Sequence, residues 1–214
     1  MIGDTVIYEA IHFKKAGLIL PKVLKTHMPG NKTVITIGGE SGTGKTEVAF
    51  IVQKKLYDNY HITSRVIHTD DYYKTYWCER NKIRKKKGIQ YVGQDEILWD
   101  KFQSVIDSFV NNEDENHIQQ IHKYTNSIEY VKLNNKTIDI FIVEGLYSLY
   151  LHDHSDLNIY LCGTIKDTEA FRRKRKKEEQ NAFRLQVLQK EGKVVRASEQ
   201  WADLKITFSG KIEK

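Results

Sequence analysis

The sequence predicts an α/β fold of three layers, with a central parallel sheet and helices on both of its faces. Short β-branched runs alternate along the chain with stretches in which apolar residues recur at helical spacing. Strands that alternate with helices form parallel sheets, because each parallel connection needs a crossover segment. The 214 residues, of which 40% are hydrophobic and 29% charged, are enough for one domain with a sizeable core.

Residues 1–32 are predicted to be an N-terminal extension, and residues 33–214 the main domain. The extension has patterns that fit either a short helix or a strand. Pro21 and Pro29-Gly30 are expected to break it.

The main domain opens with a β-branched run at residues 33–37 that reads as a buried strand. The sequence after it, Gly39-Glu40-Ser41-Gly42-Thr43-Gly44-Lys45-Thr46, matches G-x-x-x-x-G-K-[ST], the phosphate-binding loop, or P-loop. The glycines let backbone N–H groups form an anion-binding nest, Lys45 adds a charge for the outer phosphates, and the Thr46 hydroxyl suits Mg²⁺. Helically spaced apolar residues follow, so strand, loop and helix together predict a P-loop NTPase fold rather than a surface glycine turn.

The remaining elements follow the same alternation. Strands are predicted at residues 65–69, 118–124, 128–133, 138–143, 157–161 and 205–208. Helices are predicted from Asp95 and over residues 168–189, the latter long and basic or broken into a pair, with Gly192 as an interruption. Residues 74–93 are polar and basic and are expected to form a loop.

Carboxylates follow two of the predicted strands, Asp70 and Asp71 after one and Glu144 after the other. Ligands bind beyond the carboxyl ends of the strands in an open parallel sheet, so these acids are expected near the P-loop. There Thr46 and a carboxylate would hold the metal, and a second carboxylate would take a proton from a substrate hydroxyl. The alternatives are turn residues for the aspartates and a helix-start acid for Glu144.

Two basic runs account for the net charge of +6, one at residues 82–87 and one at residues 172–177. The second could close over bound phosphates, form a solvated helix face or contact nucleic acid, whereas the first reads as a solvated loop. Aromatic residues after the second strand could belong to the core or line a pocket: Tyr72, Tyr73, Tyr76 and Trp77.

Other signals are weak. No secretory leader and no membrane-spanning run is evident, which predicts a cytoplasmic protein without a membrane partner. Cys78 and Cys162 match no metal or redox spacing and read as reduced thiols. His152-x-His154 suggests a metal pair but has no evident third ligand. The oligomeric state stays open, and a homo-oligomer is compatible with the sequence.

These segments resemble the uridine kinase and phosphoribulokinase group of P-loop kinases over about residues 33–210. The matching motifs are the P-loop, Asp70-Asp71-Tyr72-Tyr73-Lys74, Val143-Glu144-Gly145-Leu146, Ala170-Phe171-Arg172-Arg173 with Lys176, and residues 198–204. The resemblance implies that Asp70 is the catalytic base, that Tyr73 touches substrate, and that Glu144 assists Mg²⁺. We also expect Asp70 to contact the metal and Tyr72 to contact substrate. The resemblance also implies a lid at about residues 168–190 whose Arg173 and Lys176 grip the phosphates, with Lys45 and Arg173 in catalytic roles.

The departures from that group cluster where the acceptor would bind, at residues 91–94, 121–128 and 180–183. A site that loses hydrogen-bonding groups for one substrate should change its specificity. We therefore expect an ATP- and Mg²⁺-dependent phosphotransferase acting on a hydroxyl of a small metabolite other than uridine, with nucleic acid disfavoured as a partner. The alternative is a nucleotide-binding regulatory protein or a nucleic-acid-associated NTPase.

Overall fold

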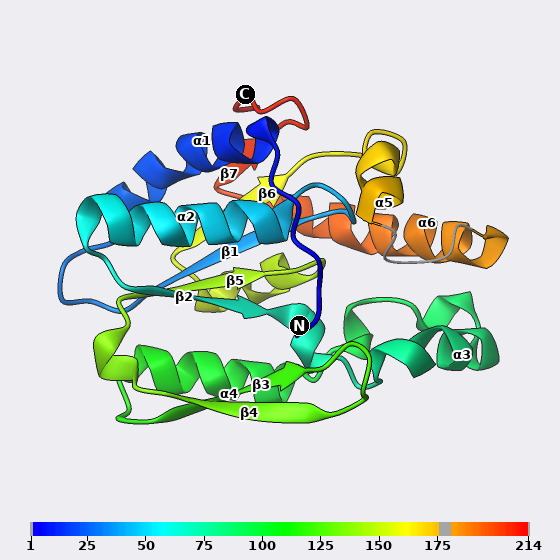
Figure 1. Ribbon diagram of the computed structural model, residues 1–214, viewed down its shortest axis with the longest axis horizontal. Coiled ribbons are helices and arrows are strands. Elements are labelled where there is room, and N and C mark those ends of the chain that lie inside the picture. The colour runs from blue at the N-terminus through cyan, green and yellow to red at the C-terminus, as the bar shows by residue number, and fades with distance from the viewer. Residues whose placement is uncertain (1, 176–180, 214) are drawn as a thin grey trace.

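A computed structural model describes residues 2–175 and 181–213, and it has the predicted parallel sheet at its centre (Figure 1). The sheet has five strands in the order β2-β5-β1-β6-β7, and all of its pairings are parallel. The strands are β1 (Thr33–Gly39), β2 (Ser64–His68), β5 (Ile140–Glu144), β6 (Leu157–Leu161) and β7 (Leu204–Ile206).

Helices cover both faces of this sheet, which confirms the three-layer α/β prediction (Figure 1). On one face lie α1 (Ala10–Thr26) and α2 (Lys45–Tyr60), and on the other lie α4 (Trp99–Val110) and α6 (Ala182–Ala197). Two further helices, α3 (Trp77–Lys87) and α5 (Glu169–Arg175), flank the end of the sheet at which the P-loop lies.

Strand β1 lies in the middle of the sheet, and every one of its residues is buried. Its alternate side chains enter the two layers: Ile35 and Ile37 pack with α1 and α2, whereas Val34 packs with α4. On the α4 side, the Phe109 and Phe141 rings stack with their centroids 3.7 Å apart, which joins that helix to β5. The two cores together hold the strands in register, and the register sets the position of every strand end.

A separate antiparallel hairpin, β3 (Asn116–Ile121) and β4 (Ile128–Leu133), lies beside α4 as the sequence predicted (Figure 1). The buried Asp71 carboxylate accepts a hydrogen bond of 2.9 Å from the Ile121 backbone N–H, and the Asp71 carbonyl accepts one from the Gln119 amide. Asp71 is therefore an anchor for this hairpin, in agreement with the turn-residue alternative rather than with a role in chemistry.

The structure corrects four local expectations. Residues 77–87 form the helix α3 instead of a loop, because Lys, Arg and Glu are strong helix formers even without an apolar stripe. Pro21 lies inside α1, which continues to Thr26, and α4 begins at Trp99 rather than at Asp95. Gly192 lies within α6, where a Cβ atom would come 2.9 Å from Glu40 Oε2, so this glycine permits close packing on the P-loop.

The basic segment expected at 168–189 is a broken pair, α5 and α6. Among the described residues, no helix combines the length and the apolar character that crossing a membrane requires.

We predict that Phe109→Ala lowers the free energy of unfolding by about 3–5 kcal/mol, because it removes a fully buried ring from the contact between α4 and β5. Urea denaturation followed by far-UV circular dichroism measures the change. The control is Val110→Ala at the neighbouring position, where the side chain is exposed and the expected change is within about 0.5 kcal/mol. Equal effects of the two substitutions would contradict the packing described.

Candidate active site

The P-loop connects the end of β1 to the start of α2. Gly44 precedes α2 with φ of 89°, a left-handed conformation that favours glycine, and a Cβ atom there would lie 2.5 Å from the His12 ring. Lys45 Nζ folds back over the loop and donates to the Glu40 carbonyl at 2.9 Å. The first backbone N–H groups of α2 have no carbonyl partner within the helix. Together with the N–H groups of the P-loop they therefore form an anion-binding site.

Two segments far away in the sequence hold this loop in place. Lys15 of α1 is buried and donates from Nζ to the Thr43 carbonyl at 2.9 Å, and burial lowers the pKa of Lys15 to about 8. On the other side, Arg196 of α6 pairs with the carboxylate of Glu40, whose pKa burial raises against the opposing charge of Arg196. Neither Lys15 nor Arg196 belongs to a motif, and sequence analysis missed both.

Glu144 at the end of β5 contacts groups from two other elements. Its Oε1 lies 2.5 Å from His68 Nδ1 of β2 and accepts a hydrogen bond of 3.1 Å from the Thr46 hydroxyl of α2. Burial alone would raise the pKa of Glu144, but the hydrogen bond and charge of His68, with the charge of Lys45, lower it to about 2. The carboxylate is therefore ionised at neutral pH.

This oxygen-rich corner fits a Mg²⁺ ion that is shared with phosphates. Hard oxygen ligands from one or two side chains, completed by water and phosphate, are the usual magnesium environment in such sites. Thr46 and Glu144 supply these oxygens, and Asp70 faces the same cavity. In the described part of the chain, no group of three or more His, Cys, Asp or Glu residues could hold a metal by itself.

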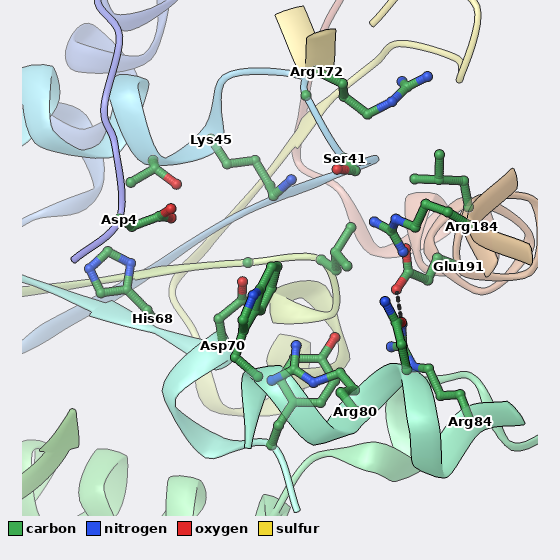
Figure 2. Close-up of a pocket in the computed structure, with 18 of the residues that line it drawn as sticks. Asp4, Ser41, Lys45, His68, Asp70, Arg80, Arg84, Arg172, Arg184 and Glu191 are labelled. Carbon is green, nitrogen blue, oxygen red and sulfur yellow. Dashed lines mark hydrogen bonds and ion pairs between the residues drawn. The ribbon is translucent and has the colours of Figure 1, made fainter. Parts of the chain in front are cut away.

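A cavity of about 490 Å³ extends from the P-loop to α3 and α6 (Figure 2). P-loop residues form its one end, and the end of β2 contributes His68 and Asp70. Of the residues predicted to bind nucleotide, metal or substrate, the cavity is lined by Ser41, Gly42, Lys45, Thr46, Asp70, Tyr73 and Glu144. The structure thus brings the predicted P-loop, base and metal residues together at one cavity.

The four aromatic residues after β2 are divided among the core, the cavity and, for the half-buried Tyr76, neither of the two. Tyr72 is buried against Phe102, with its ring centroid 4.5 Å away, and its hydroxyl accepts from the Gln119 N–H. The structure therefore places Tyr72 in the core and not at the cavity, contrary to its predicted contact with substrate. Tyr73 and Trp77 line the cavity, and burial raises the pKa of Tyr73 well above its usual range.

The structure places Arg172 at the cavity, where the prediction had placed its neighbour Arg173. Arg172 lines the cavity beside Gly42, whereas Arg173 points outward and pairs with Glu169 one helical turn before it, at 2.6 Å. Arg173 therefore does not contact the phosphate end, because one residue along a helix turns the side chain by about 100°. Lys176, predicted beside it, lies outside the described residues.

An arginine-rich wall faces the P-loop across the cavity (Figure 2). Arg84 of α3 binds Glu96 through two hydrogen bonds of 2.7 and 2.8 Å and also pairs with Glu191 at 3.0 Å. Arg184 pairs with the same Glu191 at 3.1 Å. Burial would raise the pKa of Glu191, but the charges of Arg184 and Arg84 hold it below its usual value.

The sequence of α3 contains a signal that could have revealed this wall, namely polar and aromatic residues that recur at helical spacing. Five residues of α3 recur at helical spacing, and all of them line the cavity: Trp77, Arg80, Asn81, Arg84 and Lys85. The basic run at residues 82–87 is consequently only partly solvated, since Arg84 is buried in ion pairs.

The N-terminal segment before α1 forms another wall. Ile2 pairs with the hairpin through hydrogen bonds of 3.0 Å to the Ile121 carbonyl and 3.1 Å from the Lys123 N–H. Between this pairing and α1, Asp4 and Val6 line the cavity. Residues of the predicted extension thus take part in the candidate site.

The two histidines considered as a metal pair lie outside the cavity. His152 stacks on Trp201 at 4.2 Å, and His154 Nε2 lies 2.7 Å from the Gln103 amide nitrogen, so these two histidines have structural neighbours and do not converge on the cavity. Both cysteines are free thiols, and Cys78 lines the cavity next to Trp77.

Comparison with known proteins assigns the chain to a family. The profile of the Phosphoribulokinase / Uridine kinase family matches residues 34–180. The chain belongs to this family. It is thereby a kinase of the phosphoribulokinase and uridine kinase type, and the match includes the P-loop, Asp70 and Glu144. No curated protein sequence matches the chain.

Solved structures share the fold at low sequence identity. A candidate fructose transport system kinase from Silicibacter sp. TM1040 is 15% identical with a TM-score of 0.67, over 85% of this chain and 94% of that one. D-glycerate 3-kinase from Cryptococcus neoformans is 11% identical with a TM-score of 0.62, over 97% and 99%. Phosphoribulokinase from Rhodobacter spheroides is 10% identical with a TM-score of 0.64, over 83% and 70%. Such likeness confirms the fold of this kinase.

The lowered pKa of Glu144 predicts that the contribution of this residue to stability depends on pH. Because the folded-state pKa of about 2 lies below the ordinary 4.5, this carboxyl stabilises the fold above about pH 4.5, and the contribution is lost as the pH falls toward 2. We predict that Glu144→Gln lowers the free energy of unfolding by up to about 3 kcal/mol at pH 7 and by less at pH 3.5. Urea titrations at both pH values measure the difference.

The matched control for this test is Glu113→Gln, at an exposed position of the turn after α4, which should change stability little at either pH. A Glu144→Gln deficit of the same size at pH 7 and pH 3.5 would contradict the ionised, His68-bound carboxylate.

Proposed function

We propose that this kinase transfers the γ-phosphate of ATP to a hydroxyl group of a small metabolite, with Mg²⁺ as its metal. The observation that carries the proposal is the shared cavity, in which Lys45 of the P-loop and Asp70 at the end of β2 face the same space of about 490 Å³. Phosphoryl transfer needs this combination of a phosphate cradle and a base that orients the nucleophile.

In the proposed reaction the P-loop amides and Lys45 bind the β- and γ-phosphates of ATP. Bound Mg²⁺ would neutralise charge on the phosphate oxygens, with Thr46 and Glu144 as the residues that hold it. His68 keeps the Glu144 carboxylate oriented toward Thr46 through its 2.5 Å contact. Arg172 adds a positive charge beside the loop, where negative charge accumulates during transfer.

Asp70 is the proposed base. It accepts the proton of the acceptor hydroxyl while that oxygen forms a bond to the γ-phosphorus, and the bond from the γ-phosphorus to the β–γ bridging oxygen breaks to release ADP. Asp70 is partly exposed and lines the cavity, where it can act on substrate. Its neighbour Asp71 is buried and anchors the hairpin, so the two adjacent acids have different roles, one chemical and one structural.

The proposed acceptor is a metabolite other than uridine. Asn181 and Phe183 line the cavity in a segment where the sequence departs from the uridine kinase pattern. Solved structures with this fold carry the names of kinases for chemically different hydroxyl compounds. This supports a fold in which the ATP-binding part is shared and the acceptor-binding part varies.

We predict that Asp70→Asn keeps ATP affinity within about threefold and lowers kcat by about 10²- to 10⁴-fold, because the amide cannot accept the proton. ADP release measured over a panel of nucleosides, sugars, sugar phosphates and hydroxy acids identifies a working acceptor, on which wild type and variant are compared. Titration of ATP into both proteins checks that the donor site is intact.

The control for the base is Asp100→Asn, which removes an exposed carboxylate from α4 and should leave kcat unchanged. Unchanged turnover of Asp70→Asn on the working acceptor would exclude Asp70 from the role of base. If no acceptor in the panel stimulated ADP release, a regulatory role would be favoured over the kinase role.

The two lid arginines provide an internal comparison. Arg172→Ala should lower kcat by about 100-fold, because it removes a charge at the phosphate end of the cavity. Arg173→Ala removes an equal charge that pairs with Glu169 at the surface and should change kcat less than about twofold. Equal losses in the two variants would show that the lid orients its side chains differently from the arrangement described.

A further inference from the structure

Arg80 is a buried cation that forms no ion pair with an acidic side chain among the described residues. Its side chain lies on α3 with 6% of the residue exposed, and its Nε has no hydrogen-bond partner. Across the described residues, no side-chain hydrogen bond or ion pair is formed by its guanidinium. Burying an unpaired charge is costly, so such an arginine in a cavity wall indicates a place for an anion from outside the chain.

The neighbouring arginines make the contrast clear. Arg84, one turn further along α3, is neutralised by Glu96 and Glu191, and Arg184 also pairs with Glu191. These two cations belong to an internal ion-pair network that joins α3 to α6. The charge of Arg80 also acts on Glu191, but among the described residues Arg80 forms no ion pair within that network, so its N–H donors remain available to the cavity.

Aromatic contacts fix the plane of the Arg80 guanidinium. Its central carbon lies 3.4 Å from the centroid of the Tyr73 ring and 5.4 Å from that of Trp77. Stacking of this kind restrains the group while leaving the edge of its N–H donors free to bind, which suits carboxylate and phosphate oxygens. Figure 2 shows Arg80 and Asp70 on the α3 side of the cavity, with Lys45 opposite.

We propose that Arg80 binds an anionic group of the acceptor, a carboxylate or a phosphate monoester, while the acceptor's hydroxyl lies at Asp70. The inference rests on the proposed kinase function and adds the chemical class of the acceptor. A neutral polyol would leave Arg80 unpaired in its buried position, whereas an anion would form charge-assisted hydrogen bonds to the guanidinium edge.

The experiment uses acceptors that share a carbon skeleton and differ in whether they carry an anionic group. One set is glycerol, glycerate and glycerol 3-phosphate, and a second is ribose, ribonate and ribose 5-phosphate, with inorganic phosphate as the simplest anion. Binding is measured by titration calorimetry with and without a saturating non-hydrolysable ATP analogue, and turnover by ADP release. Because each set shares one carbon skeleton, a preference for its carboxylate or phosphate member reports the anion directly.

The variants are Arg80→Gln, Arg80→Lys and the control Lys82→Gln. Lys82 is exposed on the same helix and does not line the cavity, so the control removes an equal charge from α3. In wild type, at least one anionic member is expected to bind about 10- to 100-fold more tightly than its neutral counterpart. Arg80→Gln should abolish this preference, Arg80→Lys should retain part of it, and Lys82→Gln should retain it fully.

Turnover separates the acceptor site from the donor chemistry. Arg80→Gln should raise the KM for the anionic acceptor by about 10- to 100-fold while changing the KM for ATP less than about twofold. Equal binding of neutral and anionic members in wild type, an unaltered preference in Arg80→Gln, or no Arg80-dependent binding of any anion overturns the proposal.

Failure of this inference differs from failure of the kinase function. ADP release with neutral acceptors that is indifferent to Arg80 would overturn the anion site and keep the kinase. Arg80-dependent anion binding without ADP release from any acceptor would keep the anion site and overturn the kinase.

Discussion

The buried carboxylate of Glu144 is the constraint on which the rest of the site depends. An ionised acid can stay in the interior only if donors surround it, and here they come from His68 of β2 and Thr46 of α2. These contacts require β2 and β5 to end side by side, which their register provides by pairing His68 with Glu144. The P-loop, the metal corner and the turn that carries Asp70 are consequently fixed relative to one another by one charge.

Positive charge in this protein is divided between support and binding. Arg84 and Arg184 both pair with Glu191, and the Arg84 pair joins α3 to α6 across the sheet end. Arg196 and Lys15 support the P-loop from outside the cavity, where they do not meet its contents. A net charge or a basic run in the sequence does not separate these uses, because the distinction depends on which carboxylates the fold brings within reach.

Much of the fold and of the donor half was predictable, because its residues are contiguous motifs. The P-loop is unbroken in sequence. Glu144 is the last residue of β5 and Asp70 follows shortly after β2, so the parallel pairing of these two strands brings the acids together. Arg172 was missed in favour of its neighbour, because the phase of α5 depends on packing that sequence does not state. The polar wall of α3 was missed because helix prediction relies on apolar spacing, and its residues are stabilised by distant acids.

The pairing of Ile2 with residues of the hairpin bears on the order in which the site is assembled. Ile2 is synthesised well before the hairpin, because its backbone partners at Ile121 and Lys123 lie more than half of the 214 residues further on. Contacts of such high sequence separation close late, since the entropy of a long loop must be overcome before they form. The wall that carries Asp4 therefore completes the cavity only once residues 121–123 have been synthesised, long after the P-loop at residues 39–46.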